Sequence, residues 1–190
     1  KTAVGGSIPS APAMAIYVVL AAYLVLLAAT AAFLVFWTYT LIIAPAKGSP
    51  FARTRRGRTD RMLELAGVKP GELLLDLGSG DGSVLIAAPR RGARAVGVEI
   101  NPFFVWYSRW RIRRNGLAHL ARVERGDLFN HPIGQADIVF MFLLPRAIEG
   151  LRERLSAEAK PGSRIVSHLF PISGWTPQKI EDNIFLYSIM

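Results

Sequence analysis

The chain has 190 residues, 51% of them hydrophobic, and carries 23 Lys and Arg against 14 Asp and Glu, a net charge of +9. It has no cysteine, which excludes disulfides and thiolate metal sites. The basic charge is compatible with nucleic acid or an anionic membrane as a partner, but no nucleic-acid-binding motif accompanies it. The three histidines lack metal-ligand spacing. We therefore expect no nucleic-acid partner and no bound metal.

The first element is a long apolar segment, residues 14–43, inside a stretch without charge from Thr2 to Ala46. A bilayer core of ~30 Å needs about 20 apolar residues in a helix. A buried helix of this length would be unusual in so short a chain, and a cleaved signal peptide has a shorter apolar region. We therefore predict that residues 1–46 hold one N-terminal transmembrane helix. The pair Ala28 and Ala32 is compatible with an oligomer formed through this helix.

The next segment, residues 47–71, is basic and contains a short helix, expected at Thr59–Ala66. Its first part, residues 47–61, has a single acid, Asp60, and six basic residues: Lys47, Arg53, Arg55, Arg56, Arg58 and Arg61. An excess of Lys and Arg marks the cytoplasmic flank of a transmembrane helix. We therefore expect a single-pass membrane protein with its C-terminal domain on the cytoplasmic side. Anionic lipid head groups are the expected partners of the basic segment.

Strands and helices alternate in the last region, residues 72–190. Helices are expected at 83–91, 102–115 and 146–157, and strands at Glu72–Leu77, Ala93–Val98, Ala121–Arg125, Ala136–Phe142 and Ser163–Leu169. Two more strands are expected at about Trp175–Ile180 and Asn183–Ile189. This alternation predicts an α/β fold with a doubly wound, mostly parallel, Rossmann-like sheet. Its ligand should bind outside the carboxyl ends of the strands.

A glycine-rich loop, DLGSGDG at residues 76–82, follows the first of these strands. Glycines at alternate positions permit positive φ and a close approach of the backbone to a ligand. Glu99 ends the second strand, where a carboxylate can reach ribose hydroxyls, and Asp127 follows the third, where an adenine amino group can donate to it. Ser83 at the last position of the dinucleotide fingerprint disfavours NAD, and no P-loop lysine is present.

These acids and glycines together resemble the motifs of class I, seven-strand methyltransferases, which use S-adenosylmethionine. The resemblance implies S-adenosylmethionine as the cofactor, without a metal. It also implies a candidate cofactor-binding set: Asp76, Leu77, Gly78, Ser79, Gly80, Asp81, Gly82, Glu99, Ile100, Asn101, Asp127 and Leu128.

Later motifs extend the resemblance over nearly the whole chain. They are EINP at 99–102, FLLP at 142–145, RIVS at 164–167, Phe170-Pro171 and Trp175-Thr176-Pro177. Their order is similar to that in membrane-anchored lysine methyltransferases that modify the adenine nucleotide translocase and the ATP synthase c subunit in mitochondria. It implies methylation of a lysine in an integral membrane protein at the membrane surface. The membrane would be the cell membrane in a prokaryote and a mitochondrial membrane in a eukaryote.

A lysine acceptor must reach the methyl group neutral, although its ordinary pKa is about 10.4. An apolar pocket and a neighbouring sulfonium both disfavour the ammonium form. Phe142, Pro145 and Trp175 lie on loops that can build such a pocket, and His168 is a candidate proton acceptor. Asp137 lies at the wrong end of its strand, so we assign no general base.

The helix at 102–114 combines five aromatic residues with four arginines. The stripe of Phe103, Trp106 or Tyr107, and Trp110 has helical spacing, which favours an aromatic face packed on the sheet. The alternative is a second membrane contact at the interface.

Two rival functions remain open. A methyltransferase of a lipid or another membrane-partitioned small molecule would have the same anchor and cofactor motifs, and would differ only in its acceptor pocket. A non-enzymatic cofactor-binding or scaffold protein would be expected to lose acids of the cofactor set, and all three are present.

Overall fold

The structure is a computed structural model that describes residues 11–38 and 56–190. Contacts divide the chain into two compact units, residues 1–42 and 43–190. The predicted transmembrane residues 39–43 and the basic residues Lys47, Arg53 and Arg55 lie outside the described part.

In the first unit the structure describes the helix α1 (Ala11–Thr38), whose described side chains are all exposed. Its segment Met14–Thr38 has a mean hydropathy of 2.6 over its most apolar window, and among the described helices it alone is long and apolar enough to cross a membrane. Twenty-five helical residues extend about 38 Å, more than the ~30 Å of a bilayer core. The Thr30 hydroxyl donates to the Leu26 carbonyl oxygen at 2.8 Å, so this polar group is satisfied within the helix.

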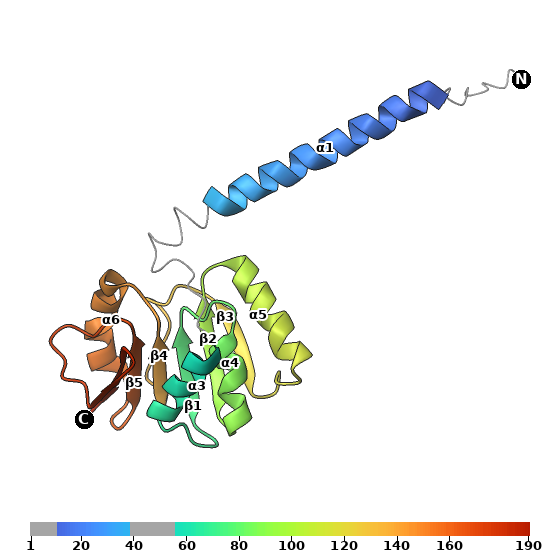
Figure 1. Ribbon diagram of the computed structural model, residues 1–190. Coiled ribbons are helices and arrows are strands. Elements are labelled where there is room, and N and C mark those ends of the chain that lie inside the picture. The colour runs from blue at the N-terminus through green and yellow to red at the C-terminus, as the bar shows by residue number, and fades with distance from the viewer. Residues whose placement is uncertain (1–10, 39–55) are drawn as a thin grey trace, which may run out of the picture. The chain divides into compact units, whose positions relative to one another are not determined.

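The second unit is built on a seven-stranded sheet, within residues 56–190, in the order β3-β2-β1-β4-β5-β7-β6 (Figure 1). The strands are β1 (Leu73–Leu77), β2 (Arg94–Glu99), β3 (Ala121–Arg125), β4 (Ile138–Met141), β5 (Arg164–His168), β6 (Lys179–Glu181) and β7 (Ile184–Ser188). The first five are parallel, whereas β7 is antiparallel to both β5 and β6. The doubly wound, mostly parallel Rossmann-like sheet predicted from the sequence is thus confirmed.

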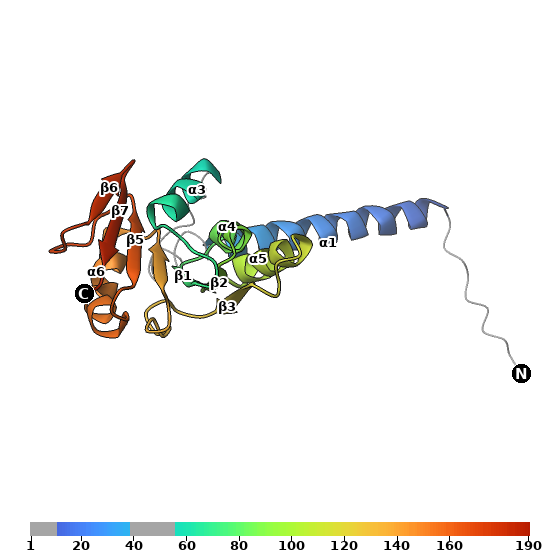
Figure 2. The same cartoon turned by 90° about the horizontal axis from the view of Figure 1, so that it is seen from below.

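Helices cover both faces of the sheet, because alternate strand residues are apolar on both sides. On one face lie α3 (Arg56–Leu65), α4 (Ser83–Ala87) and α5 (Pro102–Arg114), which contribute Leu63, Leu85 and Val105 to a core with Leu74 and Phe140. The other face is covered by α6 (Pro145–Glu158), whose inner side chains pack with residues 128–136 and with the opposite face of the strands (Figure 2). Because β1, β2, β4 and β5 are parallel, their carboxyl ends lie along the same edge of the sheet.

Two predicted elements differ from those observed. The helix expected at 83–91 ends at Ala87 and continues only as a 3₁₀ turn, η2 (Pro89–Arg91), because Pro89 has no N–H for the helical ladder. The strand expected at 175–180 is reduced to β6, since Pro177 cannot donate to a strand ladder. The tight turn between β6 and β7 uses Asp182 and Asn183, both with positive φ.

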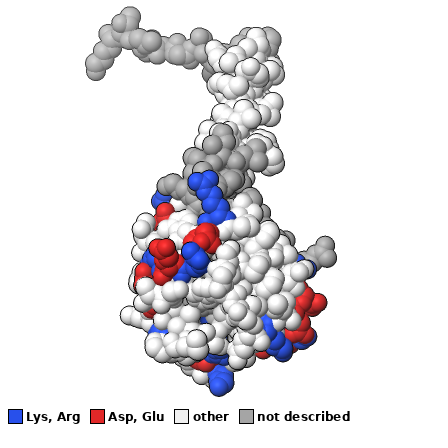
Figure 3. Space-filling view, turned by 90° about the vertical axis from the view of Figure 1, so that its left-hand side faces the viewer, with Lys and Arg blue, Asp and Glu red and all other residues white. Residues whose placement is uncertain are grey.

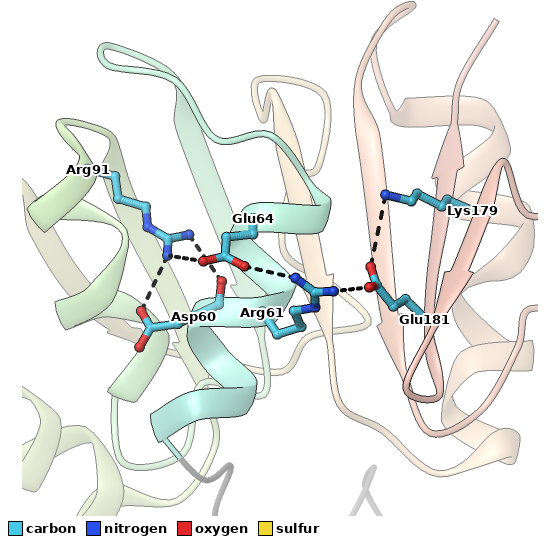
Figure 4. Close-up of polar contacts among 6 residues, drawn as sticks. All are labelled: Asp60, Arg61, Glu64, Arg91, Lys179 and Glu181. Carbon is cyan, nitrogen blue, oxygen red and sulfur yellow. Dashed lines mark hydrogen bonds and ion pairs between the residues drawn. The ribbon is translucent and has the colours of Figure 1, made fainter.

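Ion pairs connect α3 to its neighbours on both sides (Figure 4). Arg61 contacts Glu181 of β6 and lies 3.2 Å from Glu64, and Arg91 of η2 lies 3.4 Å from Asp60. Exposed pairs of this kind contribute little energy individually. Their effect is to fix where α3 lies between η2 and β6.

Candidate active site

The glycine loop turns back over the end of β2 immediately after β1. The N–H groups of Gly78 and Ser79 both donate to the Val98 carbonyl oxygen, at 2.9 and 3.0 Å. Gly78 and Gly82 have φ of +84° and +72°, a conformation that residues with a Cβ rarely adopt. A Cβ on Gly78 would lie 3.1 Å from the Leu143 side chain, so the loop after β4 borders the glycine loop directly.

Glu99 fixes the geometry of this loop from the end of β2. One of its carboxylate oxygens accepts the Gly80 N–H at 2.9 Å, and the other accepts the Asn101 N–H at 2.7 Å. The Asn101 side chain in turn accepts the Phe103 N–H and caps α5. Each carboxylate oxygen keeps a second lone pair with which it can accept a hydroxyl of a bound ribose.

Asp76 lies at the centre of the sheet, beside Gly97 of β2 and Phe140 of β4. Burial raises the pKa of its carboxyl to about 7, with smaller contributions from the charges of Glu99 and Asp81. Three acids thus converge on one side of the glycine loop. A buried cluster of carboxylates is costly by itself, but it suits a ligand that brings positive charge.

Three residues absent from the predicted set hold the loop in place. The Ser108 hydroxyl of α5 is fully buried and donates to the Gly80 carbonyl oxygen at 2.7 Å. Arg111 of the same helix forms an ion pair of 2.7 Å with Asp81. A Cβ on Gly97 would lie 2.5 Å from both the Leu85 side chain and the Ser79 hydroxyl, so only glycine fits there. Nothing in their local sequence distinguishes these residues, because their contacts are long-range.

The predicted adenine-side residues follow β3. The Asp127 carboxylate is half-buried and accepts the Phe129 N–H at 3.0 Å, which closes a short turn. Leu128 is buried, and its side chain would lie 4.0 Å, a van der Waals distance, from a Cβ placed on Gly78. The side chain of Leu77 is fully buried in the core, so only its backbone can border a ligand.

Three of the residues predicted for the acceptor pocket, Phe142, Pro145 and His168, lie at or just after the ends of β4 and β5. The rings of Phe142 and His168 are in contact, with centroids 4.3 Å apart and planes tilted by 56°, and Pro145 begins α6 two residues beyond Leu143. His168 is 1% exposed, and neither ring nitrogen has a hydrogen-bond partner among the described residues. Burial lowers its pKa to about 4, with a smaller contribution from the positive charge of Arg58. Its ring is therefore neutral at pH 7.

Two further residues follow β5 in the chain. Leu169 follows His168 with φ of +70°, which is strained for a leucine, and its side chain is 38% exposed. Sequence patterns do not reveal such a conformation. Trp175 packs edge-on against Tyr187, with centroids 5.7 Å apart, and adjoins the core beneath α6. The structure thus places Phe142 and His168 together, whereas Trp175 packs against the core beneath α6.

The donor-side residues fit S-adenosylmethionine. The backbone at Gly78 leaves room that a side chain would fill, Glu99 offers acceptors for ribose, and the nearby acids favour a positively charged group. Within residues 11–38 and 56–190, no cluster of His, Cys, Asp or Glu is arranged to hold a metal ion.

Known proteins share both this sequence and this fold. The family described as the ANTKMT methyltransferase domain matches residues 76–179. A protein-lysine N-methyltransferase of Saccharolobus islandicus is 39% identical over 74% of this chain and 93% of its own length. The lysine N-methyltransferase of the ATP synthase c subunit from Rattus norvegicus is 36% identical over 73% of this chain, which spans 65% of that protein.

One solved structure has a similar fold. The RNA methyltransferase of Salinibacter ruber, in complex with S-adenosyl-L-homocysteine, has a TM-score of 0.71 and 39% identity over 73% of this chain and 94% of its own. The prediction of an S-adenosylmethionine-dependent methyltransferase is confirmed by the shared fold and sequence, and the chain belongs to the family of the ANTKMT methyltransferase domain.

Proposed function

We propose that this protein methylates the side-chain amine of a lysine in an integral membrane protein, at the membrane surface. The observation that carries the proposal is the ring contact between Phe142 and His168 at the ends of β4 and β5. Leu143, the residue after Phe142, borders the glycine loop. The names of two relatives, one archaeal and one mammalian, support lysine as the acceptor.

On the donor side, the chain has to hold the cofactor in one orientation. S-adenosylmethionine, when bound, supplies an electrophilic methyl group on a positively charged sulfur. Glu99 and Asp127 hold its adenosine, and the glycine loop lets the backbone approach it. Asp76 is ionised only partly at pH 7, because burial raises its pKa to about 7. Positive charge near Asp76 shifts it towards the carboxylate, which makes binding of the donor more favourable.

On the acceptor side, the lysine amine must lose its proton before it can react. Phe142 excludes water, and a neutral His168 adds no positive or negative charge, so the pocket disfavours the ammonium form. The low pKa of His168 makes it too weak a base to take a proton from an ammonium group. We assign it instead a positioning role, in which an unprotonated ring nitrogen accepts a hydrogen bond from the amine. The proton itself leaves to solvent.

Confinement to the membrane completes the proposal. The apolar segment Met14–Thr38 of α1 spans the bilayer, and the basic residues that follow it keep the catalytic domain on the cytoplasmic side. An integral membrane protein is then the natural class of acceptor, as the name of the rat relative suggests.

The experiment follows the methyl group. Purified full-length protein is incubated with radiolabelled S-adenosylmethionine and whole membranes, and protein, lipid and nucleic acid are then separated. We expect the label in protein, recovered as methyllysine after hydrolysis. Glu99→Gln should abolish this labelling through loss of a ribose acceptor. Glu153 is an exposed acid on α6, so Glu153→Gln should leave the labelling unchanged. Label in the lipid fraction would replace the proposal with lipid methylation.

RNA methylation is the second candidate, and two observations favour it. The Salinibacter structure, 39% identical to this chain, is described as an RNA methyltransferase, and the net charge of +9 suits a nucleic acid. The same experiment decides between the two, because label that survives protease and is released by ribonuclease would establish RNA as the acceptor.

A further inference from the structure

The exposed side of α5 is occupied by aromatic and basic residues. The helix buries Val105, Ser108 and Ile112 against the sheet and the glycine loop. Phe103, Trp106 and Trp110 are 45%, 62% and 43% exposed on the outside. Sequence periodicity favoured an aromatic stripe packed on the sheet, and the structure shows that prediction to be wrong.

The charge on this side has one sign. The helix contains four arginines and no acidic residue. A hollow of about 420 Å³ beside it is lined by Trp106 and Trp110 together with Arg109, Arg113 and Arg125. No carboxylate lies within ion-pair distance of these three arginines among the described residues. By contrast, acidic and basic side chains lie side by side on the face that carries β6, β7 and α6 (Figure 3).

A second hollow, of about 540 Å³, lies on the other side of Trp110. It is lined by Arg90, Arg91, Arg111 and Arg114, and the Arg114 guanidinium stacks over the Trp110 ring at 5.3 Å. Arg91 and Arg111 are paired with Asp60 and Asp81, so this hollow is closer to neutral than the first. The first hollow is therefore the stronger site for an anion.

We propose that this aromatic–arginine face of α5 is a membrane-interface contact, at which Arg109, Arg113 and Arg125 bind the phosphate of anionic phospholipids and Phe103, Trp106 and Trp110 enter the headgroup layer. Amphipathic aromatic rings and arginines are the residues favoured at that depth. The occupant is a bilayer rather than RNA, because Phe103, Tyr107 and Trp110 stack on one another along the helix, which leaves fewer open faces for bases. The same chain also carries the apolar helix α1.

The contact would serve the reaction, and in this respect it rests on the proposed function. Phe103 lies two residues after Asn101, whose backbone N–H donates to the Glu99 carboxylate. Pro102, between them, lines the first hollow. Docking α5 on lipid would thus bring the donor-side edge of the sheet to the membrane surface, where a lysine of a membrane protein is presented.

The absence of cysteine makes a direct test possible. Full-length protein with the single substitution Phe103→Cys carries a nitroxide label and is reconstituted into vesicles of phosphatidylcholine, with or without phosphatidylglycerol. Ser156→Cys, exposed on α6 at the opposite face of the sheet, is the matched control. We expect the label at 103 to become accessible to oxygen dissolved in the bilayer only with phosphatidylglycerol, while the label at 156 stays aqueous in both.

Replacing Arg109, Arg113 and Arg125 together by Gln should return the label at 103 to water, because each arginine near an anionic surface contributes about fivefold to binding. Calorimetric binding of S-adenosylmethionine should stay within twofold. A label that stays aqueous on anionic vesicles, or that enters both vesicle types equally, would overturn the proposal, as would immobilisation by RNA but not by vesicles. These readouts do not depend on methyl transfer, so a failure to methylate lysine would count against the proposed function alone.

Discussion

Asp76 and His168 are both buried ionisable residues, and burial shifts their pKa values in opposite directions. The carboxyl of Asp76 is held towards its protonated form, and the ring of His168 towards its unprotonated form. Each shift favours the neutral state, as expected when water is excluded. In the proposed reaction the two residues have different partners, because the donor would bring positive charge near Asp76, whereas the acceptor amine would meet His168.

Asp76→Asn should stabilise the free protein and weaken the donor site. Because the folded pKa of about 7 exceeds the unfolded value of 3.8, the contribution of Asp76 to stability is fully present below about pH 4 and is lost as pH rises through 7. At about 1.4 kcal/mol per pKa unit, the loss is a few kcal/mol. Thermal unfolding of the free protein from pH 5 to pH 8 should show the decline in the wild type and less of it in Asp76→Asn.

The same variant should bind S-adenosylmethionine at least tenfold more weakly in calorimetry, because a neutral amide does not attract its positive charge. A variant with unchanged pH dependence of unfolding would contradict the raised pKa. Unchanged affinity would instead contradict the placement of Asp76 at the donor site.

Substitutions of His168 test its proposed role at the acceptor. His168→Phe should lower kcat at least tenfold by removing the hydrogen-bond acceptor, while His168→Gln should recover part of it and neither should change donor affinity. With a folded pKa of about 4, the wild-type rate should show no acid limb from this residue above about pH 5. Its contribution to stability is present above pH 6.5 and is lost as pH falls through 4. An inflection of kcat near pH 6.5 that vanishes in His168→Gln would refute the positioning role.

At the scale of elements, the close packing of β2, α4 and the glycine loop depends on Gly97. An added methyl would lie 2.5 Å from the Leu85 side chain and from the Ser79 hydroxyl, both of which are buried. Gly97→Ala should therefore destabilise the protein by about 1–3 kcal/mol. Gly57→Ala in α3 is the matched control, since nothing lies within 4 Å of its Cβ, and it should be neutral or slightly stabilising. Thermal unfolding in detergent micelles measures both, and equal midpoints would contradict the packing described.

The parallel strands and the glycine turn after β1 were predicted from the sequence, because each depends on a local pattern. Runs of apolar residues define β1 and β4, and glycines at fixed spacing define the loop between β1 and α4. Ser108 and Arg111 were missed because they contact the loop from 28 and 30 residues away. The prediction of the buried face of α5 also failed. The aromatic stripe and the stripe of Val105, Ser108 and Ile112 both have helical spacing, and only the packing against β2 and β3 decides which stripe is buried.

At the scale of the whole molecule, the chain divides into an apolar helix and a catalytic domain. The division falls between Ile42 and Ile43, and the residues proposed for donor binding all lie beyond Leu73. A protein that starts near Phe51 therefore keeps every donor contact. It loses confinement to the bilayer plane, which raises the local concentration of a membrane-embedded acceptor without adding any contact to it.

We therefore expect the truncated protein to bind S-adenosylmethionine within threefold of the full chain, measured by calorimetry. Its methylation of lysine in membrane proteins should fall by at least an order of magnitude, whereas methylation of a soluble lysine peptide should be unchanged. The peptide is the internal control, because it reports the chemistry at Phe142 and His168 without membrane confinement. Undiminished activity on membranes would show that α1 is not needed for access to the acceptor. A loss of donor affinity in a folded truncation would show that residues before Phe51 contribute to the donor site itself.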